Sequence, residues 1–300
     1  MSTAMKDKDG KTTDPRKQGP QPPFKEQPQA PPGLSEQMQE QPDYGEESYK
    51  GFGRLQNRKA LITGGDSGIG RAVALAYARE GADVLISYLN EEEDAQESAR
   101  LVREAGRKAV TAPGSIEDPK HCEELVNRAF REMGGLDILV NNAAFQMTHE
   151  SIEELTAEEW DKTFKTNISA MFYLSRAALP RMKEGGVIIN TTSVQAYQPN
   201  PGLLAYASTK GAIVTFTKAL SQMAIKQGIR VNAVAPGPVW TPLIPSTMPQ
   251  KKVEQFGKSN PQERPAQPAE LAPTYVFLAS DESRYITGGV FDLTGGKMLP

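Results

Sequence analysis

The sequence of 300 residues is poor in the residue types that build disulfide frameworks and metal sites, with one cysteine and two histidines. A single cysteine, Cys122, excludes an internal disulfide framework and is typical of a reducing compartment. His121, His149 and Cys122 lack the spacing of a zinc site, so we predict no bound metal. An excess of positive charge is also missing, and a net charge of −3 gives no basic field for nucleic acid or an anionic membrane.

Long hydrophobic runs are absent as well. No apolar stretch reaches the length that spans a bilayer, and the N-terminus lacks the hydrophobic core of a signal peptide. We therefore expect a soluble, cytoplasmic protein with no membrane and no nucleic acid among its partners. The length allows one large α/β domain or two small ones.

The first 50 residues differ in composition from the rest. They hold eight of the 23 prolines and many Gln, Lys and Glu, with almost no aliphatic residues. Such a segment buries too little apolar surface to offset its ordering entropy, which favours a disordered tail over about residues 1–35. The alternative is an extended arm laid over the domain or over a neighbouring subunit, with Tyr44, Tyr49 and Phe52 as anchors. We place the boundary between an N-terminal arm, 1–45, and a folded domain, 46–300.

Beyond the arm, strands alternate with helices. Buried-type apolar runs predict strands at 59–63, 84–87, 108–112, 136–140, 187–192, 229–234 and 289–293. Helical periodicity predicts helices at 71–80, 91–105, 119–133, 156–183 (interrupted near Thr166), 206–227 and 269–279. The Pro-rich stretch 242–261 is long enough for a mobile lid, with a short amphipathic piece near 253–256. Because such alternation requires crossovers, it predicts a parallel sheet covered by helices on both faces.

The stretch 193–210 combines a hydroxyl, a phenol and an amine. Tyr206 and Lys210 are four residues apart at the start of a predicted helix, which places them on one face, one turn apart. A protonated amine beside a phenol lowers the phenol's pKa, and a phenol tuned toward neutrality can exchange a proton near pH 7. Ser193 follows a predicted strand, at the end where open α/β sheets bind ligands. A lone Tyr-x-x-x-Lys pair is more often a solvated helix face, so this pattern needs independent support.

A glycine-rich turn upstream gives that support. Residues 64–70, Gly-Gly-Asp-Ser-Gly-Ile-Gly, lie between the first predicted strand and the first predicted helix. Glycines permit a tight turn and let backbone amides approach a pyrophosphate, which the helix N-terminus also attracts. At the start of a doubly wound pattern, this turn indicates a dinucleotide site.

Together, the motifs resemble the short-chain dehydrogenase/reductase superfamily. The matching positions, in order, are Thr63-Gly64-x-x-x-Gly68-x-Gly70, Asn141-Asn142-Ala143, Asn167, Ser193, Tyr206-x-x-x-Lys210 and Pro236-Gly237. The resemblance covers about residues 55–297. The Pro/Gln-rich leader and the runs around 63–70 and 236–245 are also similar to a bacterial subgroup of general-stress and glucose-dehydrogenase-like oxidoreductases.

The resemblance implies a single Rossmann-type domain of about seven parallel strands and hydride transfer between a nicotinamide cofactor and a CH–OH or carbonyl substrate. Tyr206 would be the acid or base, Lys210 would hold the nicotinamide ribose and lower the pKa of Tyr206, Ser193 would orient the substrate oxygen, and Asn167 would hold a water beside Lys210. The remaining cofactor-binding positions would be Gly64, Asp66, Ser67, Gly68, Ile69, Gly70, Tyr88, Leu89, Ser115, Ile116, Asn142, Ala143, Pro236, Gly237, Val239 and Thr241. Asn142 would lie by the adenine-side ribose; the alternative is a simple turn residue at a strand end.

Two positions depart from the family pattern. Ser115 stands where an Asp often lies near the adenine, which predicts a weaker contact there. The second predicted strand ends without the carboxylate that binds the ribose 2′-OH of NAD and without an Arg for the 2′-phosphate of NADP. Asp66 adds negative charge in the phosphate turn, so we expect NAD as cofactor, with NADP possible.

The substrate cleft is expected to be lined by Ala144, Phe145, Gln195, Tyr197, Trp240 and the loop after Thr241. A packing role for Tyr197 and Trp240 is an equally open alternative. The predicted lining does not distinguish between an alcohol, a polyol, a sugar and a small ketone as substrate. Extra apolar surface on the helices near 171–181 and 213–223, with the family resemblance, predicts a homotetramer. The alternative function is a dinucleotide-binding sensor or scaffold that uses the arm to bind a partner.

Overall fold

A seven-stranded parallel sheet forms the centre of the computed structural model, which describes residues 14–298. The strands are β1 Lys59–Thr63, β2 Asp83–Tyr88, β3 Ala109–Pro113, β4 Ile138–Asn141, β5 Val187–Thr191, β6 Arg230–Pro236 and β7 Val290–Leu293. Their order is β3-β2-β1-β4-β5-β6-β7, and all pairs are parallel. The chain therefore reverses direction across the sheet between β1 and β4, where open sheets of this kind form a crevice beyond the carboxyl ends of the strands.

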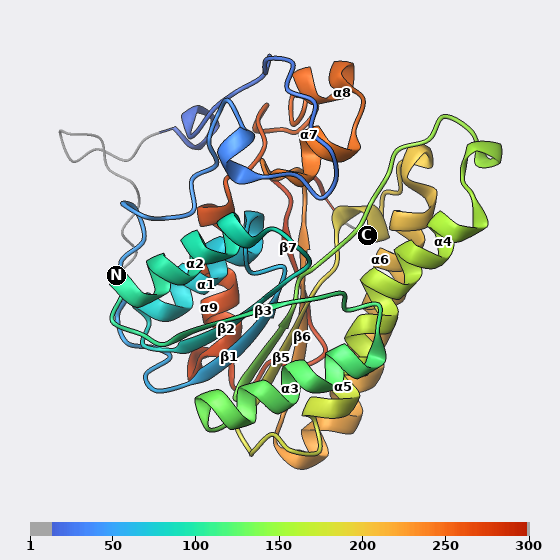
Figure 1. The fold of residues 1–300 in the computed structure, drawn as a ribbon. Helices are drawn as coiled ribbons and strands as arrows, with labels where there is room; N and C mark the ends of the chain where they lie inside the picture. Colours follow the sequence, from blue (N-terminus) through green and yellow to red (C-terminus); the bar gives the residue numbers. More distant parts are fainter. Residues whose placement is uncertain (1–13, 299–300) are drawn as a thin grey trace.

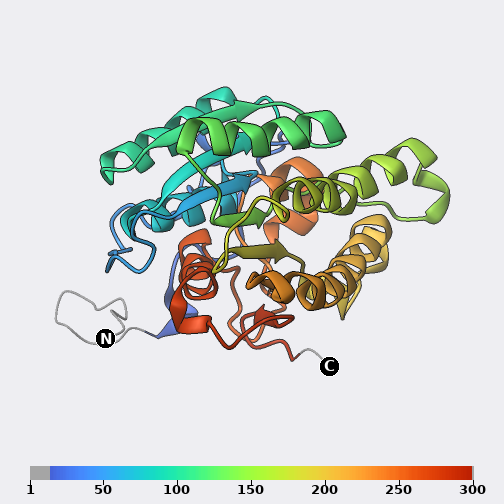
Figure 2. The same cartoon turned by 90° about the horizontal axis from the view of Figure 1, so that it is seen from below.

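Helices cover both faces of the sheet (Figures 1 and 2). One layer contains α1 Gly68–Arg79, α2 Glu92–Glu104 and α9 Pro268–Ala279; the other contains α3 Pro119–Met133, α5 Ala170–Ala178 and α6 Leu204–Ala224. Two buried apolar clusters fill the spaces between the sheet and these layers. Central strands such as β1 and β5 are buried on both faces, which explains their continuous apolar runs. The predicted Rossmann-type architecture is confirmed.

The interruption predicted near Thr166 is a π-helical turn. Helix α4, Ala157–Phe164, passes through a π-helical segment, Lys165–Ser169, into α5. Such turns often mark functional positions, because they change the direction of a side chain within a continuous helix. No helix among residues 14–298 is both long and apolar enough to cross a membrane.

The lid stretch contains two short helices, α7 Leu243–Thr247 and α8 Gln250–Glu254. Only the second was anticipated, near 253–256. Figure 1 shows the N-terminal segment, in dark blue, beside α7 and α8.

Residues 14–57 form no strand and no α-helix; they run over the domain in extended segments with two short 3₁₀ turns, Pro15–Lys17 and Ser35–Gln37. Residues 1–13 lie outside the described residues, and the division of the chain at residue 45 stays a prediction.

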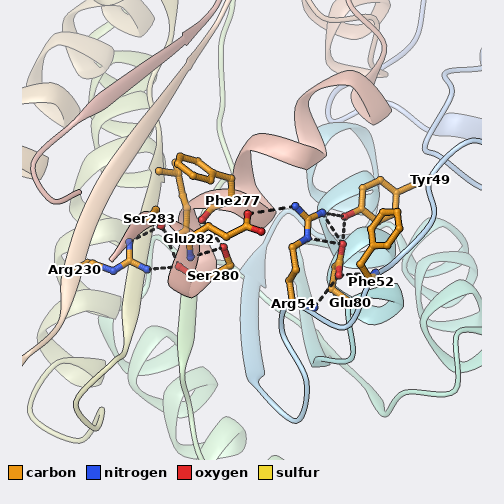
Figure 3. Close-up of polar contacts among 10 residues, drawn as sticks. Tyr49, Phe52, Arg54, Glu80, Arg230, Phe277, Ser280, Glu282 and Ser283 are labelled. Carbon is orange, nitrogen blue, oxygen red and sulfur yellow. Dashed lines mark hydrogen bonds and ion pairs between the residues drawn. The ribbon is translucent and has the colours of Figure 1, made fainter. Parts of the chain in front are cut away.

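The C-terminal end of this segment is fastened to Glu80, just after α1 (Figure 3). The Glu80 side chain is fully buried. It accepts hydrogen bonds from the Tyr49 hydroxyl at 2.6 Å, from the Phe52 and Arg54 amides at 2.9 Å, and from the Arg54 guanidinium at 2.6 Å. Burial alone would raise the pKa of Glu80, but these donors outweigh it and hold the pKa at about 2. Glu80 is therefore a charged anchor for the arm.

Candidate active site

A cavity of about 890 Å³ lies at the carboxyl ends of the strands. That volume is within the range of small-molecule and cofactor sites. Segments after β1, β2, β3, β4, β5 and β6 all contribute to its wall, as do α7 and α8 of the lid. The position agrees with the crevice at which the strand order reverses.

The glycine turn forms the floor of one part of the cavity. Gly64 and Gly68 have positive φ angles of 60° and 52°, which favour glycine. A Cβ at Gly70 would lie 1.8 Å from the Gly64 carbonyl oxygen, so only glycine lets α1 approach β1 this closely. Gly64, Asp66, Ser67, Gly68 and Ile69 line the cavity, whereas Gly70 supports the turn from beneath. The turn therefore offers the N-terminus of α1 to an anion, which fits a dinucleotide pyrophosphate.

Tyr206, Lys210 and Ser193 meet in the same cavity. Helix α6 places the Lys210 amine 5.0 Å from the centre of the Tyr206 ring, and that amine donates to the Thr191 carbonyl at 3.0 Å. The Ser193 hydroxyl, just after β5, donates to the Pro236 carbonyl at 3.5 Å and accepts from the Gln195 amide at 3.2 Å. Tyr206 and Lys210 come from one helix turn and Ser193 from a strand end, as the spacing predicted.

The expected effect of Lys210 on Tyr206 was wrong for the chain by itself. Burial raises the pKa of Tyr206 to about 12, and the hydrogen bond from Ser193 lowers it only in part. Burial also lowers the pKa of Lys210 to about 7, so the amine loses much of its charge near neutral pH. A half-neutral amine beside the ring, rather than at the hydroxyl, does not offset the desolvation of a phenolate.

Asn167 lies in the π-helical turn and is fully buried. Its Oδ1 accepts from the Phe145 amide at 2.7 Å, and its Nδ2 donates to the Phe145 carbonyl and to Thr209 Oγ1. These bonds tie α4–α5 to the segment after β4 and to α6. Asn167 is absent from the cavity wall in the described residues, so it supports the Tyr206 helix from behind.

Asn142 joins two strand ends. Its Nδ2 donates to the Thr63 and Gly64 carbonyls at 3.2 and 3.1 Å, and Ala143 donates its amide to Thr63 Oγ1. Both residues line the cavity beside the glycine turn. These hydrogen bonds hold the glycine turn against the end of β4.

One end of the cavity is acidic. It is lined by Tyr88, Leu89, Glu91, Ser115, Ile116 and Glu117, next to Asp66. Burial, and then the neighbouring Glu91 charge, raise the pKa of Asp66 to about 7. The nearby Arg71 guanidinium is 2.7 Å from the Asp94 carboxylate and also donates to the Asp66 carbonyl. None of the lining residues that follow β2 and β3 in the described chain is a Lys or Arg, so these two strand ends offer no cation to a 2′-phosphate.

The predicted substrate residues divide into two groups. Ala144, Phe145 and Gln195 line the cavity, as do Pro236, Gly237, Val239 and Thr241 on its cofactor side. Trp240 and Tyr197 do not line it in the described chain, and Trp240 is fully buried under the Phe24 ring, 3.8 Å away.

Sequence reasoning placed the loop after Thr241 at the cleft, and Ile244, Met248 and Asn260 of that loop line the cavity. It missed other lining residues, among them Gln146, Leu203, Pro31 and Pro32. A Pro before the first residue of α7 was a usable signal for that helix. Nothing local in the sequence marks Pro31 and Pro32, because a contact with residues more than 200 positions away places them there.

Known proteins share this arrangement. A family profile described as enoyl-(acyl carrier protein) reductase matches residues 64–297. General stress protein 39 of Bacillus subtilis is 50% identical over 268 residues, which cover 89% of this chain and 94% of that protein. The chloroplastic NADPH-dependent aldehyde reductase 1 of Arabidopsis thaliana is 43% identical, with coverage of 92% and 98%. A short-chain dehydrogenase of Burkholderia cenocepacia, solved in complex with NADP, superposes with a TM-score of 0.76 at 34% identity, covering 81% of this chain and 98% of that one.

Proposed function

Because this chain belongs to the short-chain dehydrogenase/reductase superfamily of nicotinamide-dependent oxidoreductases, we propose that Tyr206, Ser193 and Lys210 are its catalytic residues, acting on a CH–OH or carbonyl group. One observation supports this above the others: Tyr206, Ser193 and Lys210 all line the wall of the one large cavity, and Ser193 acts on the Tyr206 phenol strongly enough to lower its pKa in part. A substrate oxygen that contacts both hydroxyls would receive or give a proton at Tyr206 Oη. The Ser193 Oγ donates to that oxygen and stabilises its developing charge.

The glycine turn and the strand ends fit a dinucleotide. Backbone amides at the start of α1 would hold the pyrophosphate, and Val239 and Thr241 would lie on the nicotinamide side. When bound, the nicotinamide ring accepts or donates the hydride and, in its oxidised form, adds positive charge to the cavity. That charge would favour the Tyr206 phenolate, which the buried chain alone disfavours.

Lys210 and Asn167 would act around Tyr206. The Lys210 amine lies beside the ring and would bind ribose hydroxyls. Asn167 is a positioning residue, since its amide links Phe145, after β4, to Thr209 in the helix that carries Tyr206. We assign it no direct contact with substrate.

The acidic end of the cavity supports NAD as the preferred cofactor. Asp66 and Glu91 line the cavity and would disfavour a 2′-phosphate near them, and Asp94 engages the Arg71 guanidinium. The names of the Arabidopsis relative and of the Burkholderia complex carry NADPH and NADP, so use of NADP by this chain is a second outcome. Because the pKa of Asp66 is about 7, any NADP use should increase as the pH falls below 7.

The substrate class is an alcohol, polyol, sugar or small ketone, with Ala144 and Gln195 in its pocket. Phe172, Met223 and Ile225 are exposed apolar side chains on or just after α5 and α6, which supports a homotetramer; light scattering would measure its mass. We place the protein in the cytoplasm, in keeping with its lone buried thiol.

The test removes the Tyr206 hydroxyl oxygen and keeps the ring. Tyr206→Phe should lower turnover at least 1,000-fold across a panel of sugars, polyols and secondary alcohols, because the proton donor is lost. NADH binding, followed by its fluorescence, should stay within about threefold, and parallel titration with NADPH measures the cofactor preference. Tyr197→Phe is the matched control, because Tyr197 does not line the cavity. Equal turnover by wild type and Tyr206→Phe would reject the mechanism.

A dinucleotide-binding sensor or scaffold is the alternative function. It expects tight NADH binding by the wild type with no turnover of any carbonyl or alcohol in the panel. Ser193, Tyr206 and Lys210 at one cavity argue against it, because a scaffold needs none of the three there.

A further inference from the structure

Residues 24–44, called the strap here, lie outside the matched family segment, which begins at residue 64. They pack against the lid through a small apolar cluster of their own. Phe24 and Met38 from the strap join Trp240, Ile244 and Val253, all buried. The Phe24 and Trp240 rings are stacked at 13°, with centroids 3.8 Å apart. This cluster is separate from the two that flank the sheet, so strap residues complete the apolar core of the lid.

Polar contacts tie the strap to the same lid. The Phe24 amide donates to the Glu254 carbonyl at 2.9 Å, and Trp240 Nε1 donates to the Glu40 carbonyl at 2.7 Å. Ser246 Oγ, on α7, lies 3.2 Å from the Pro32 carbonyl and shares its one proton between that carbonyl and those of Pro242 and Leu243. The strap therefore contacts the lid along both α7 and α8.

The other side of the strap is tied to the dinucleotide half of the domain. The Ser35 amide donates to Asp94 at 2.9 Å, and the same carboxylate pairs with Arg71. The Arg71 guanidinium lies 4.6 Å above the ring of Tyr44 and donates to the Asp66 carbonyl in the glycine turn. One short segment thus reaches from the lid to the phosphate turn.

Between these two anchor points, Pro31 and Pro32 line the cavity. They stand between Ser246 on the lid and the start of α2, where Glu91 and Leu89 also line it. We propose that the strap is the outer wall of the dinucleotide site, and that it holds the lid shut so that cofactor leaves only when the strap detaches. This inference rests on the dinucleotide site of the proposed function.

The strap's order depends on contacts that local opening can break. It contains no α-helix or strand, and a small apolar cluster with a few hydrogen bonds holds it to the lid. Such segments open more readily than the core, and the opening frequency then limits release of a ligand beneath them. Weakening the lid side should therefore speed release without changing Tyr206 or Ser193.

The experiment measures NADH dissociation by stopped-flow, using the fluorescence of NADH itself. Excess NAD prevents the released NADH from binding again. Phe24→Ala should raise the dissociation rate constant at least tenfold, and the milder Ser246→Ala should raise it about two- to fivefold. Phe52→Ala is the matched control, because Phe52 is an exposed aromatic residue of the same N-terminal region. The NADH dissociation rate constant of this variant should stay within twofold of the wild-type value. Amide exchange in residues 24–44 should also slow when NADH is bound.

If both Phe24→Ala and Ser246→Ala melt cooperatively and keep the wild-type NADH dissociation rate, the proposal that the strap holds the lid shut is wrong. If Phe24→Ala does not fold, Ser246→Ala and the amide exchange of the wild type decide. The Tyr206→Phe variant separates the two proposals, because its NADH dissociation can be followed without turnover. A wild type that binds neither NADH nor NADPH would remove the dinucleotide site and the strap's role together.

Discussion

The arm, residues 14–57, and the doubly wound domain are ordered by different means. In the domain, apolar periodicity and backbone ladders set each element, and the polar atoms at strand ends are left to form the site. The arm is held instead by domain side chains that donate to its backbone carbonyls from far away in the sequence, as Trp240 does to Glu40 and Arg264 to Pro15. The domain specifies its own structure, whereas the arm takes its course from the surface on which it lies.

This difference has a functional counterpart. The polar groups assigned to the chemistry, Tyr206, Lys210 and Ser193, all belong to the domain, where burial raises the pKa of Tyr206 and lowers that of Lys210. The arm brings only apolar and backbone groups to the cavity, through Pro31 and Pro32. Changes in the domain should therefore affect folding and chemistry, and changes in the arm should affect closure.

A glycine series would separate the two regions most strongly. A Cβ at Gly70 would lie 1.8 Å from the Gly64 carbonyl oxygen, so Gly70→Ala should cost more than roughly 4 kcal/mol and prevent dinucleotide binding. At Gly33 in the arm, φ is +87° and a Cβ would lie 2.6 Å from the Pro242 carbonyl oxygen. Gly33→Ala should cost about 2–4 kcal/mol, but leave a folded enzyme that releases NADH faster.

Gly106→Ala is the control for the series. Gly106 has φ +78° with nothing near its Cβ position, so it isolates the cost of a positive φ, about 1–2 kcal/mol. Urea unfolding of all three variants gives the free energies. A loss at Gly33 as large as that at Gly70 would mean that the arm belongs to the same cooperative unit as the sheet.

Within the domain, Lys210→Met should have opposite effects on stability and on turnover. Burial lowers the pKa of Lys210 from 10.5 to about 7, so the folded state binds fewer protons than the unfolded state between these values. Wild-type stability should therefore rise with pH from about 7 to 10.5, and the buried charge should destabilise the fold below pH 7. Lys210→Met removes that penalty and should stabilise the protein by about 2–4 kcal/mol at pH 6, while turnover falls at least 100-fold.

Thermal melts from pH 6 to 10 check this prediction. The variant should melt higher than the wild type at pH 6, and the difference should shrink as the pH rises. A variant less stable than the wild type at pH 6 would show that the Lys210 bond to the Thr191 carbonyl outweighs its desolvation.

The sequence predicts the domain well because local signals agree with the global pattern there. Helix α3 was placed at its observed bounds, since Asp118 caps it, Pro119 starts it and Gly134 ends it with a φ of +79°. The strands could be read as apolar runs because both faces of the sheet are covered. Tyr206, Lys210 and Ser193 come together because one helix turn and one strand end suffice to place them.

Other features depend on contacts that no local pattern encodes. Trp240 follows the Pro-Gly-Pro-Val run and looked like a cleft residue, but Phe24 covers it from 216 positions away in the chain. The pKa of Tyr206 depends on burial, and spacing alone gave it the wrong direction. Helix α7 was missed because Pro242 and Pro245 suggest a loop, although proline is compatible with the first turn of a helix.

The smallest effect should come from loosening the arm at its charged anchor. Glu80→Gln keeps the shape but leaves Arg54 without its buried carboxylate, for a cost of about 2–3 kcal/mol. Because the folded pKa of Glu80 is about 2, its stabilisation is present above the unfolded value near 4.5 and is lost as the pH falls from there toward 2. The variant should lose this acid dependence.

Glu282→Gln is the control for the anchor, since Glu282 is half-exposed and lies 3.6 Å from the same guanidinium (Figure 3), so its loss should cost under about 1 kcal/mol. Amide hydrogen exchange then shows which region of the protein the Glu80→Gln substitution destabilises. In Glu80→Gln, amides of residues 49–55 should exchange faster while those of β1 and β4 keep their protection. Faster exchange throughout the sheet would show that Glu80 stabilises the domain itself, and the distinction between a self-specified domain and a docked arm would then fail at residue 80.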